Sequence, residues 1–403
     1  MAYTFIDLFA GCGGLSEGFY RQGYRALAHV EIDPTACNTL RKRMEYYGYK
    51  DADKAVLEMD ITRKDIIKQI DKVVGTNPHV DLIIGGPPCQ SFSSAGRAKD
   101  ENGMKNDPRN YLFESYVKIL NRYKPKFFVF ENVTGLLTAK VDGKQHIQTI
   151  LDELGKKYKV YRGNPQNMVF NTVNYGVPQV RKRVIIFGVR KDISVLPEDL
   201  YASVIKTNWD ADMPVSQRKG LKKPVTVKDA IGDLPAISNG GGVNEIEFVP
   251  NSINAYVKRL RSADNHQLLY HISRKNNDLD KERYRVMAQN HWTFTEMLEK
   301  RADLRHPKAR VFNNSYTVQW WDEPAKTLIA HMYKDGNLFI HPDYHQERSI
   351  SVREAARLMS FPDDFEICGS RTEQYKQLGN AVPPLFAEAI AKGLKTKLKE
   401  LEK

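Results

Sequence analysis

Short apolar runs alternate with amphipathic segments along the first half of the chain. Five runs predict buried strands, at 3–9, 26–31, 80–85, 126–131 and 183–189. The segments 111–122 and 145–157, which lie between runs, have the apolar spacing of helices. This alternation is typical of βαβ units, and it predicts a mostly parallel sheet with helices on both faces. The runs are continuously apolar, which agrees with strands buried on both faces.

The pattern changes near residue 190. The segment 191–345 is polar, basic and rich in turn residues, and it includes the glycine cluster at 238–245. It predicts a second, irregular domain. Two helical patterns close the chain, at 351–359 and 383–400.

Composition narrows the class of protein. The chain has 403 residues, of which 41% are hydrophobic, and a formal net charge of +12. Such a length suits two domains. Lys and Arg displace counterions from phosphates, so a basic protein often binds a polyanion. The same charge also serves general solubility, and by itself it leaves a nucleic-acid partner open.

The cysteines and the N-terminus indicate a compartment. None of the four cysteines forms a CxxC pair, which argues against zinc, and four are too few for a disulfide framework. This usage fits a reducing environment. The sequence shows no signal peptide and no run near the roughly 20 apolar residues of a membrane span. We therefore expect a cytoplasmic protein with no bound metal and no membrane contact.

A glycine-rich turn, FAGCGG at 9–14, follows the first predicted strand. Glycines there permit a tight turn and a close approach of a ligand to the backbone. Ser16 stands where the last glycine of GxGxxG would be, which argues against NAD. Glu31, at the end of the second strand, is spaced to bind ribose hydroxyls, and Asp60 to accept from an adenine amine. Each alone is compatible with a solvated carboxylate, but together they predict an adenosine-containing cofactor.

Four further residues lie at or near the ends of predicted strands. Cys89 lies in a Gly/Pro/Ser loop after two prolines, where a cysteine is less often part of the core than elsewhere, and these residues alone leave both a structural and a reactive role open. Glu131 follows an apolar run, as a helix cap, a solvated strand end or a functional carboxyl. Arg181 and Arg183 alternate with Val180 and Lys182, which places both on one face of an extended segment. They could hold a phosphate and a base carbonyl, or be solvated charges on an edge strand.

These motifs, in this order, resemble those of the DNA (cytosine-5) methyltransferases of the bacterial restriction-modification type. The matching segments run from residue 5 to residue 384 and are FIDLFAGCGGLSEGF, GGPPCQSFS, ENV, VPQVRKRV, REAARLMSFPDDF and QLGNAVPP. The Pro-Cys loop and QLGNAVPP are the most specific of them. Periodicity alone would not have indicated methyl transfer.

The resemblance implies roles for the catalytic residues. Cys89 is expected to be the nucleophile, set up by Pro88, and Glu131 to bind or protonate the cytosine ring nitrogen. Arg183 is expected to contact the cytosine carbonyl, and Arg181 to support the loop or a phosphate. Further residues expected to bind DNA or lie on the catalytic loop are Gln90, Ser93 and Thr327, the last in the dipeptide Thr327-Leu328.

The resemblance also implies the cofactor S-adenosyl-L-methionine, with S-adenosyl-L-homocysteine as product. Ile32 and Ile61 are expected to pack against its adenine. The full set of expected cofactor contacts is Phe9, Gly11, Gly13, Gly14, Leu15, Glu31, Ile32, Asp60, Ile61, Pro88, Asn380 and Val382.

The fold that the resemblance implies is α/β, a Rossmann-like methyltransferase sheet with a second, irregular target-recognition domain. Because QLGNAVPP is among the cofactor motifs, residues 1–190 should be completed by about 346–403, with target recognition in 191–345. The reaction implied is methylation of carbon 5 of a flipped-out cytosine through a Cys89 adduct.

The implied partner is double-stranded DNA, bound by a monomer, and a companion restriction endonuclease is compatible with the motifs. Two alternatives remain. One is a tRNA cytosine-5 methyltransferase with the same catalytic domain. The other is a non-catalytic DNA-binding module, against which the intact Cys89, Glu131 and Arg183 argue.

Overall fold

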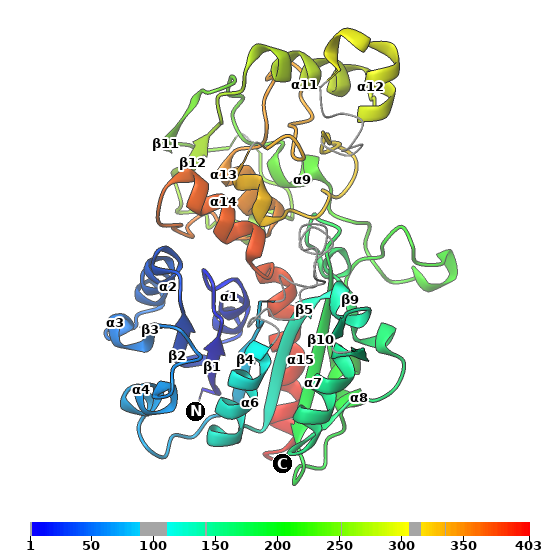
Figure 1. The fold of residues 1–403 in the computed structure, drawn as a ribbon. Helices are drawn as coiled ribbons and strands as arrows, with labels where there is room; N and C mark the ends of the chain where they lie inside the picture. The colour runs from blue at the N-terminus through cyan, green and yellow to red at the C-terminus, as the bar shows by residue number, and fades with distance from the viewer. Residues whose placement is uncertain (1, 89–110, 142, 251, 306–315, 335) are drawn as a thin grey trace. The chain divides into compact units, whose positions relative to one another are not determined.

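The computed structural model describes residues 2–88, 111–141, 143–250, 252–305, 316–334 and 336–403. The chain forms two compact units (Figure 1). Unit 1 comprises Met1–Tyr175, Lys182–Lys206 and Pro384–Lys403, and unit 2 comprises Gly176–Arg181 and Thr207–Pro383.

An eight-stranded sheet forms the centre of unit 1, in the order β3-β2-β1-β4-β5-β10-β8, with β9 paired to β10. The first five strands in this order are parallel, and β10 runs antiparallel to β5, β8 and β9. The five predicted strands and the mostly parallel sheet are therefore confirmed. The strands are β1 (Thr4–Leu8), β2 (Arg25–Glu31), β3 (Val56–Glu58), β4 (Leu82–Gly85), β5 (Phe127–Val133), β8 (Tyr158–Val160), β9 (Val169–Asn171) and β10 (Lys182–Arg190).

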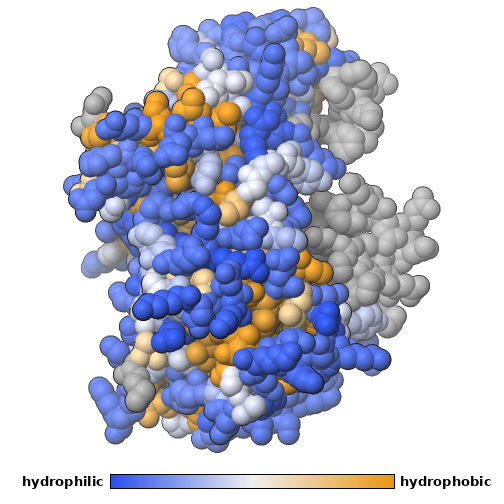
Figure 2. Space-filling model, turned by 90° about the vertical axis from the view of Figure 1, so that its left-hand side faces the viewer, coloured by the Kyte–Doolittle hydropathy of each residue, from blue (hydrophilic) through white to orange (hydrophobic). Residues whose placement is uncertain are grey.

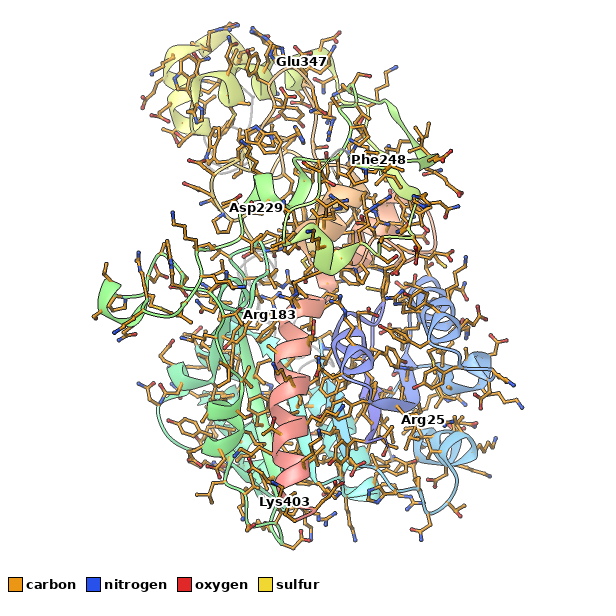
Figure 3. The ribbon with its side chains drawn as sticks, turned by 180° about the vertical axis from the view of Figure 1, so that it is seen from behind. Arg25, Arg183, Asp229, Phe248, Glu347 and Lys403 are labelled. Atoms are coloured by element: carbon orange, nitrogen blue, oxygen red, sulfur yellow. The ribbon has the colours of Figure 1, made fainter. Side chains whose placement is uncertain are left out.

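Helices cover both faces of this sheet, as the alternation of strands and helices predicts. On one face, Ile6 and Leu8 join a hydrophobic core with residues of α4, α6 and α7 (Figure 1). On the other face, Phe5 contacts Phe19 and Tyr20 of α1, and α15 lies beside α1 (Figure 3). The helices of unit 1 are α1 (Gly14–Arg21), α2 (Pro34–Tyr46), α3 (Ala52–Ala55), α4 (Ile66–Val74), α6 (Leu112–Tyr123), α7 (His146–Gly155), α8 (Pro197–Ser203) and α15 (Pro384–Glu400); two short strands, β6 (Lys140–Val141) and β7 (Lys144–Gln145), pair separately.

The last helix, α15, returns the chain to unit 1. A Cβ at Gly18 of α1 would lie 2.3 Å from the Ala387 backbone, so the two helices touch with no side chain between them. Tyr24 Oη donates a hydrogen bond of 3.0 Å to the Ala391 carbonyl. The contacts place 346–383 in unit 2, so the completing segment begins at Pro384 and not at about 346, and unit 1 extends past 190 to Lys206.

Unit 2 has little regular structure, in agreement with the irregular composition of its sequence. A cluster of large apolar side chains lies around α11 and α12 and includes Met287, Phe294 and Met297. Its helices and strands are α9 (Val227–Ile231), β11 (Gly242–Glu247), α10 (Val257–Leu260), β12 (Gln267–Ile272), α11 (Asp278–Asn290), α12 (Phe294–Lys300), α13 (Val352–Leu358) and α14 (Arg371–Asn380).

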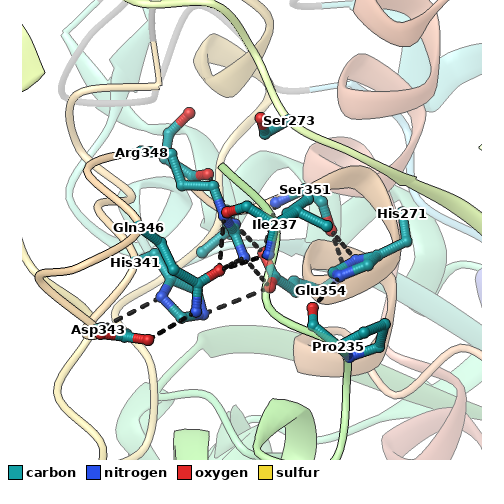
Figure 4. Close-up of polar contacts among 12 residues, drawn as sticks. Pro235, Ile237, His271, Ser273, His341, Asp343, Gln346, Arg348, Ser351 and Glu354 are labelled. Atoms are coloured by element: carbon teal, nitrogen blue, oxygen red, sulfur yellow. Dashed lines mark hydrogen bonds and ion pairs between the residues drawn. The ribbon is translucent and has the colours of Figure 1, made fainter. Parts of the chain in front are cut away.

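Buried charges also hold unit 2 together (Figure 4). Glu354 of α13 accepts two hydrogen bonds of 2.7 Å from Arg348, and its carboxylate lies 3.4 Å from His341 Nε2. Burial raises the pKa of the Glu354 carboxyl, but the Arg348 charge overcomes this effect and holds it well below its usual range. Ser351 caps α13 and bonds to His271 Nδ1 at 3.0 Å. Part of the REAARLMSFPDDF motif therefore builds the interior of unit 2, where each buried charge needs a partner.

Hydrophilic side chains cover most of the face shown in Figure 2, with smaller hydrophobic areas between them. No helix in the described ranges is long and apolar enough to cross a membrane.

Candidate cofactor and catalytic site

The turn between β1 and α1 has an unusual backbone. Phe9, Gly11 and Gly13 have φ angles of 59°, 55° and 87°. This left-handed region costs a side-chain-bearing residue roughly 1–2 kcal/mol, which explains glycine at two of the three positions. Gly13 has a second reason, since a Cβ there would lie 2.7 Å from Leu40 Cδ2. The turn thus leads directly from the strand to the N-terminus of α1, which begins at Gly14.

Glu31 joins this turn to the end of β2. Its Oε2 accepts a hydrogen bond of 2.7 Å from the Gly11 N–H, and its Oε1 accepts bonds of 2.9 Å from the N–H groups of Ile32 and Asp33. A carboxylate oxygen has two lone pairs, so Oε2 keeps one for a ligand hydroxyl. Ile32 follows with its side chain 63% exposed. The predicted proximity of the glycine turn, Glu31 and an apolar side chain is therefore present within unit 1.

Asp60 follows the end of β3 and is exposed. Its Oδ1 accepts hydrogen bonds from the Thr62 N–H at 2.8 Å and the Thr62 hydroxyl at 2.7 Å. The Met59 N–H donates to the Glu31 carbonyl at 2.8 Å, which places the end of β3 beside the end of β2. The Ile61 side chain is only 5% exposed and packs in the core. Of the two side chains expected to pack on adenine, Ile32 is therefore the exposed one, and the role of both stays a prediction.

Glu131 and Arg183 meet across two antiparallel strands. Arg183 of β10 lies opposite Val133 of β5, and its Nε is 2.9 Å from Glu131 Oε1. The two side chains are 12% and 13% exposed. Burial lowers the pKa of Arg183, while the Glu131 charge raises it. The structure therefore brings these two predicted residues into one ion pair, with guanidinium donors remaining for a further acceptor.

The loop that leads to Cys89 begins beside this pair. A Cβ at Gly86 would lie 2.6 Å from Glu131 Oε2, so this position needs a residue without a side chain. Asn132 is 4% exposed, and its Nδ2 donates to the Pro87 carbonyl at 3.1 Å. Asn132 thus ties the loop to β5. Sequence reasoning gave it no role, although its place next to Glu131 at a strand end was a usable signal.

Pro88 is the last described residue of this loop and is half-buried. Cys89, Gln90 and Ser93 lie outside the described residues. Burial raises the pKa of the Cys12 and Cys37 thiols to about 12, which keeps both in the unreactive thiol form.

In unit 2, Arg181 connects two of the other motifs. Its guanidinium donates to the carbonyls of Leu328 at 2.5 Å, Gly379 at 3.0 Å and Ala381 at 3.0 Å, and its side chain is buried. The Thr327 hydroxyl donates to the Val180 carbonyl at 2.7 Å. VPQVRKRV, Thr327-Leu328 and QLGNAVPP therefore meet inside unit 2. This burial argues against the expected phosphate contact of Arg181 and favours the other expected role, support of a loop.

Two expected cofactor contacts lie at the end of α14, also in unit 2. Asn380 is the last residue of that helix and is exposed, whereas Val382 is 9% exposed. Among the described residues, no group of three or more His, Cys, Asp or Glu side chains is arranged to hold a metal ion.

Comparison with known proteins identifies the family. The profile of the C-5 cytosine-specific DNA methylases matches residues 3–396. The chain belongs to this family. It is an enzyme that methylates carbon 5 of cytosine in DNA, and its methyl donor is S-adenosylmethionine.

Several relatives align with this methylase over nearly its full length. The type II methyltransferase M.Bpa9945I of Bacillus paralicheniformis is 34% identical, over 97% of this chain and 98% of the relative. M1.HphI of Haemophilus parahaemolyticus, also a type II methyltransferase, is 33% identical over 98% of this chain and 87% of the relative. Type II methyltransferases belong to restriction-modification systems, so the recognised type is confirmed.

Solved structures agree on the fold. A DNA modification methyltransferase encoded within an E. coli prophage superposes with a TM-score of 0.69 at 25% identity, over 99% of this chain and 100% of that one. A methyltransferase of Entamoeba histolytica reaches a TM-score of 0.54 at 14% identity and shows the fold alone. The α/β fold of S-adenosylmethionine-dependent methyltransferases is therefore confirmed.

The described residues of unit 1 fit the cofactor. The left-handed turn at 9–13 presents backbone instead of side chains, as a closely approaching ligand requires. Glu31 offers a free lone pair beside the exposed Ile32. An adenosine needs an acceptor for its ribose hydroxyls and an apolar surface for its ring. The Glu31 carboxylate and the Ile32 side chain offer these two features side by side.

Proposed function

We propose that this methylase acts on one specific double-stranded DNA sequence and methylates a cytosine that is flipped out of the duplex and held covalently by Cys89. The observation that carries the proposal is the Glu131–Arg183 pair, which lies beside the loop that reaches Cys89 three residues after Gly86. A base must leave the stack to reach such a site, because neither group could contact it within the duplex.

Each residue has a part in the proposed chemistry. The Cys89 thiolate adds to carbon 6 of the ring, which makes carbon 5 electron-rich. The Glu131 carboxyl hydrogen-bonds the ring nitrogen and stabilises the charge that develops there, and the free donors of Arg183 hold the ring carbonyl. Bound S-adenosylmethionine supplies the methyl group. A base then removes the proton from carbon 5, and the Cys89 sulfur leaves as thiolate.

The proposed division of labour assigns sequence choice to residues 191–345. Their basic and irregular sequence suits phosphate contacts and loops that read base edges. Buried ion pairs such as Arg348–Glu354 give those loops a fixed support in unit 2. We also propose that the protein acts as a monomer. The type II names of its relatives are compatible with a companion restriction endonuclease, which need not bind to it.

Covalent trapping tests the mechanism. Duplex DNA that contains 5-fluorocytosine blocks the final proton removal, so the wild-type protein should form an adduct stable to denaturation. Cys89→Ser should form none and transfer no methyl group, while Cys368→Ser should behave like the wild type. Methyl transfer by Cys89→Ser, or an adduct at another residue, would refute the assignment.

A chimera tests the division of labour. When residues 200–340 are exchanged for the matching region of a relative with a different specificity, methylation should move to that relative's site. Continued methylation of the original site by an active chimera would place recognition in the catalytic domain.

A separate assay compares methyl transfer by the wild-type protein to DNA and to tRNA. Methyl transfer to tRNA in place of DNA would favour the alternative tRNA substrate.

A further inference from the structure

A chain of buried polar side chains lies beside the glycine turn in unit 1, and the proposed chemistry does not use it. Asp7 of β1 and His29 of β2 are neighbours in the register of these strands. Ser16 and Tyr20 project onto them from α1. All four are buried, and the most exposed, Tyr20, is only 6% exposed. Polar groups in such a place need a reason, because their burial is costly.

Three short contacts connect these residues in sequence. Ser16 Oγ and Asp7 Oδ2 are 2.5 Å apart, Ser16 Oγ and His29 Nδ1 are 3.5 Å apart, and His29 Nε2 and Tyr20 Oη are 2.7 Å apart. The direct separation of Asp7 Oδ2 and His29 Nδ1 is 3.9 Å, too long for a hydrogen bond. Ser16 is therefore the link between the acid and the imidazole.

The contacts suit an uncharged acid. Asp7 Oδ1 has no hydrogen-bond partner among the described residues, and an ionised buried carboxylate would need several donors. Burial raises the pKa of Asp7 to about 8, an effect that the Ser16 bond reduces and the Glu31 charge increases, and burial lowers the pKa of His29 to about 3. The Ser16 hydroxyl donates to Asp7 Oδ2, so its oxygen is left to accept from the His29 Nδ1–H, and His29 Nε2 then accepts from the Tyr20 hydroxyl. Every link then has one donor and one acceptor.

These polar side chains connect β1, β2 and α1, the three elements that form the proposed cofactor site. Asp7 lies two residues before Phe9, and His29 lies two residues before Glu31. Ser16 is in the first turn of α1, three residues after Gly13. The hydrogen bond from the Gly11 N–H to Glu31 joins the β1–α1 turn to the end of β2. A substitution among these polar side chains would therefore alter the positions of both the β1–α1 turn and Glu31.

We propose that Asp7 is a positioning residue for S-adenosylmethionine, and that it acts through Ser16 and His29 to hold the β1–α1 turn and Glu31 in the geometry that binds the cofactor. The proposal concerns cofactor binding alone, so it stands or falls independently of the Cys89 chemistry.

Other charged and titratable groups surround these four side chains. Glu17 of α1 is paired with Arg43 of α2 at 2.7 Å and accepts a bond from Tyr47 at 3.0 Å. The neighbouring tyrosines have raised pKa values through burial, and they are Tyr20, Tyr47, Tyr49 and Tyr116. Glu31 is the remaining carboxylate close to Asp7. With a pKa raised by burial to about 8, the Asp7 carboxyl itself titrates between pH 7 and pH 9.

The first test measures S-adenosylhomocysteine binding by calorimetry from pH 6.5 to pH 9. If only protonated Asp7 supports the turn, a pKa of about 8 means that the wild-type affinity falls by roughly tenfold between pH 7 and pH 9. Asp7→Asn keeps a neutral side chain whose amide oxygen can accept from Ser16, so it should bind like the wild type at pH 7 and show no such fall. Asp7→Leu, which cannot hydrogen-bond, should bind weakly at every pH. Duplex DNA affinity should change little in all three proteins.

Melting of the protein without cofactor gives an independent readout. Unfolded Asp7 has an ordinary pKa of 3.8, so the folded protein holds one more proton between about pH 4 and pH 8. Wild-type stability contributed by this group should therefore fall as pH rises through that window, and Asp7→Asn should lack this dependence.

A second pair of variants covers the case in which Asp7→Leu does not fold. Ser16→Ala removes the linking hydroxyl and should weaken S-adenosylhomocysteine binding by about threefold to tenfold. Thr39→Val removes an equally buried hydroxyl of α2, which bonds to the Thr35 carbonyl at 3.2 Å, and should leave binding unchanged. Equal effects of Ser16→Ala and Thr39→Val, or a wild-type affinity that is constant from pH 7 to pH 9, would overturn the proposal.

Discussion

Replacement of Glu31 by Ala should weaken cofactor binding while leaving the protein folded. Three backbone N–H groups lose their acceptor, those of Gly11, Ile32 and Asp33. The side chain is half-buried, so water can replace part of this bonding, and the free energy of unfolding should fall by only about 1–3 kcal/mol.

The loss of cofactor affinity follows from the free lone pair on Glu31 Oε2. One hydroxyl bond to a charged acceptor is worth about 1.5–3 kcal/mol, so the dissociation constant of S-adenosylmethionine should rise by about 10- to 150-fold. Calorimetry with S-adenosylhomocysteine measures this directly, and thermal unfolding with and without the ligand checks that the variant is folded.

Glu58→Ala is the matched control, because Glu58 also ends a neighbouring strand and carries a partly exposed carboxylate, bonded to Arg41 at 3.2 Å. It should leave cofactor affinity unchanged. If folded Glu31→Ala bound the cofactor within twofold of the wild type, or if Glu58→Ala lost as much, the assignment of Glu31 to the ribose hydroxyls would be wrong.

Three further outcomes are expected. Gly86→Ala would place a Cβ 2.6 Å from Glu131 Oε2 and displace that carboxyl, so kcat should fall at least about tenfold while S-adenosylhomocysteine affinity stays the same; an unchanged kcat would contradict the role of the loop. Arg181→Met removes the donor to three carbonyls and should lower the free energy of unfolding by about 2–4 kcal/mol in urea titrations. A decrease of less than about 0.5 kcal/mol would show that these hydrogen bonds contribute little. Cys12 and Cys37, with thiol pKa values of about 12, should resist iodoacetamide at pH 8 in the folded protein; rapid labelling of either would contradict this raised pKa.

The local pattern of the sequence determined the elements of unit 1. The apolar runs marked five strands within a residue or two, and the spacing of 383–400 marked α15. Such signals are local, because neighbouring residues alone show whether a strand is buried on both faces or a helix on one side. The cofactor turn was visible for the same reason, since left-handed backbone at positions 11 and 13 requires glycine whatever surrounds it.

The family motifs, unlike periodicity, indicated Glu131 and Arg183 as functional residues in two separate segments. Only strand pairing showed that they touch, because β5 and β10 are neighbours in the sheet although the chain between them is about fifty residues long. The antiparallel direction of β10 and the start of the returning segment at Pro384 were likewise decided by tertiary contacts.

The tertiary structure alone decided which charged side chains are buried and what they bind. Arg181 and Glu354 look like ordinary surface charges in the sequence, yet both are buried, Arg181 against carbonyls and Glu354 against Arg348. Asp7, within an apolar strand, meets Ser16 and His29 in the same way. The cost of burying a charge or a polar group depends on the partner that the fold brings to it, and that partner lies too far along the chain for any local pattern to indicate.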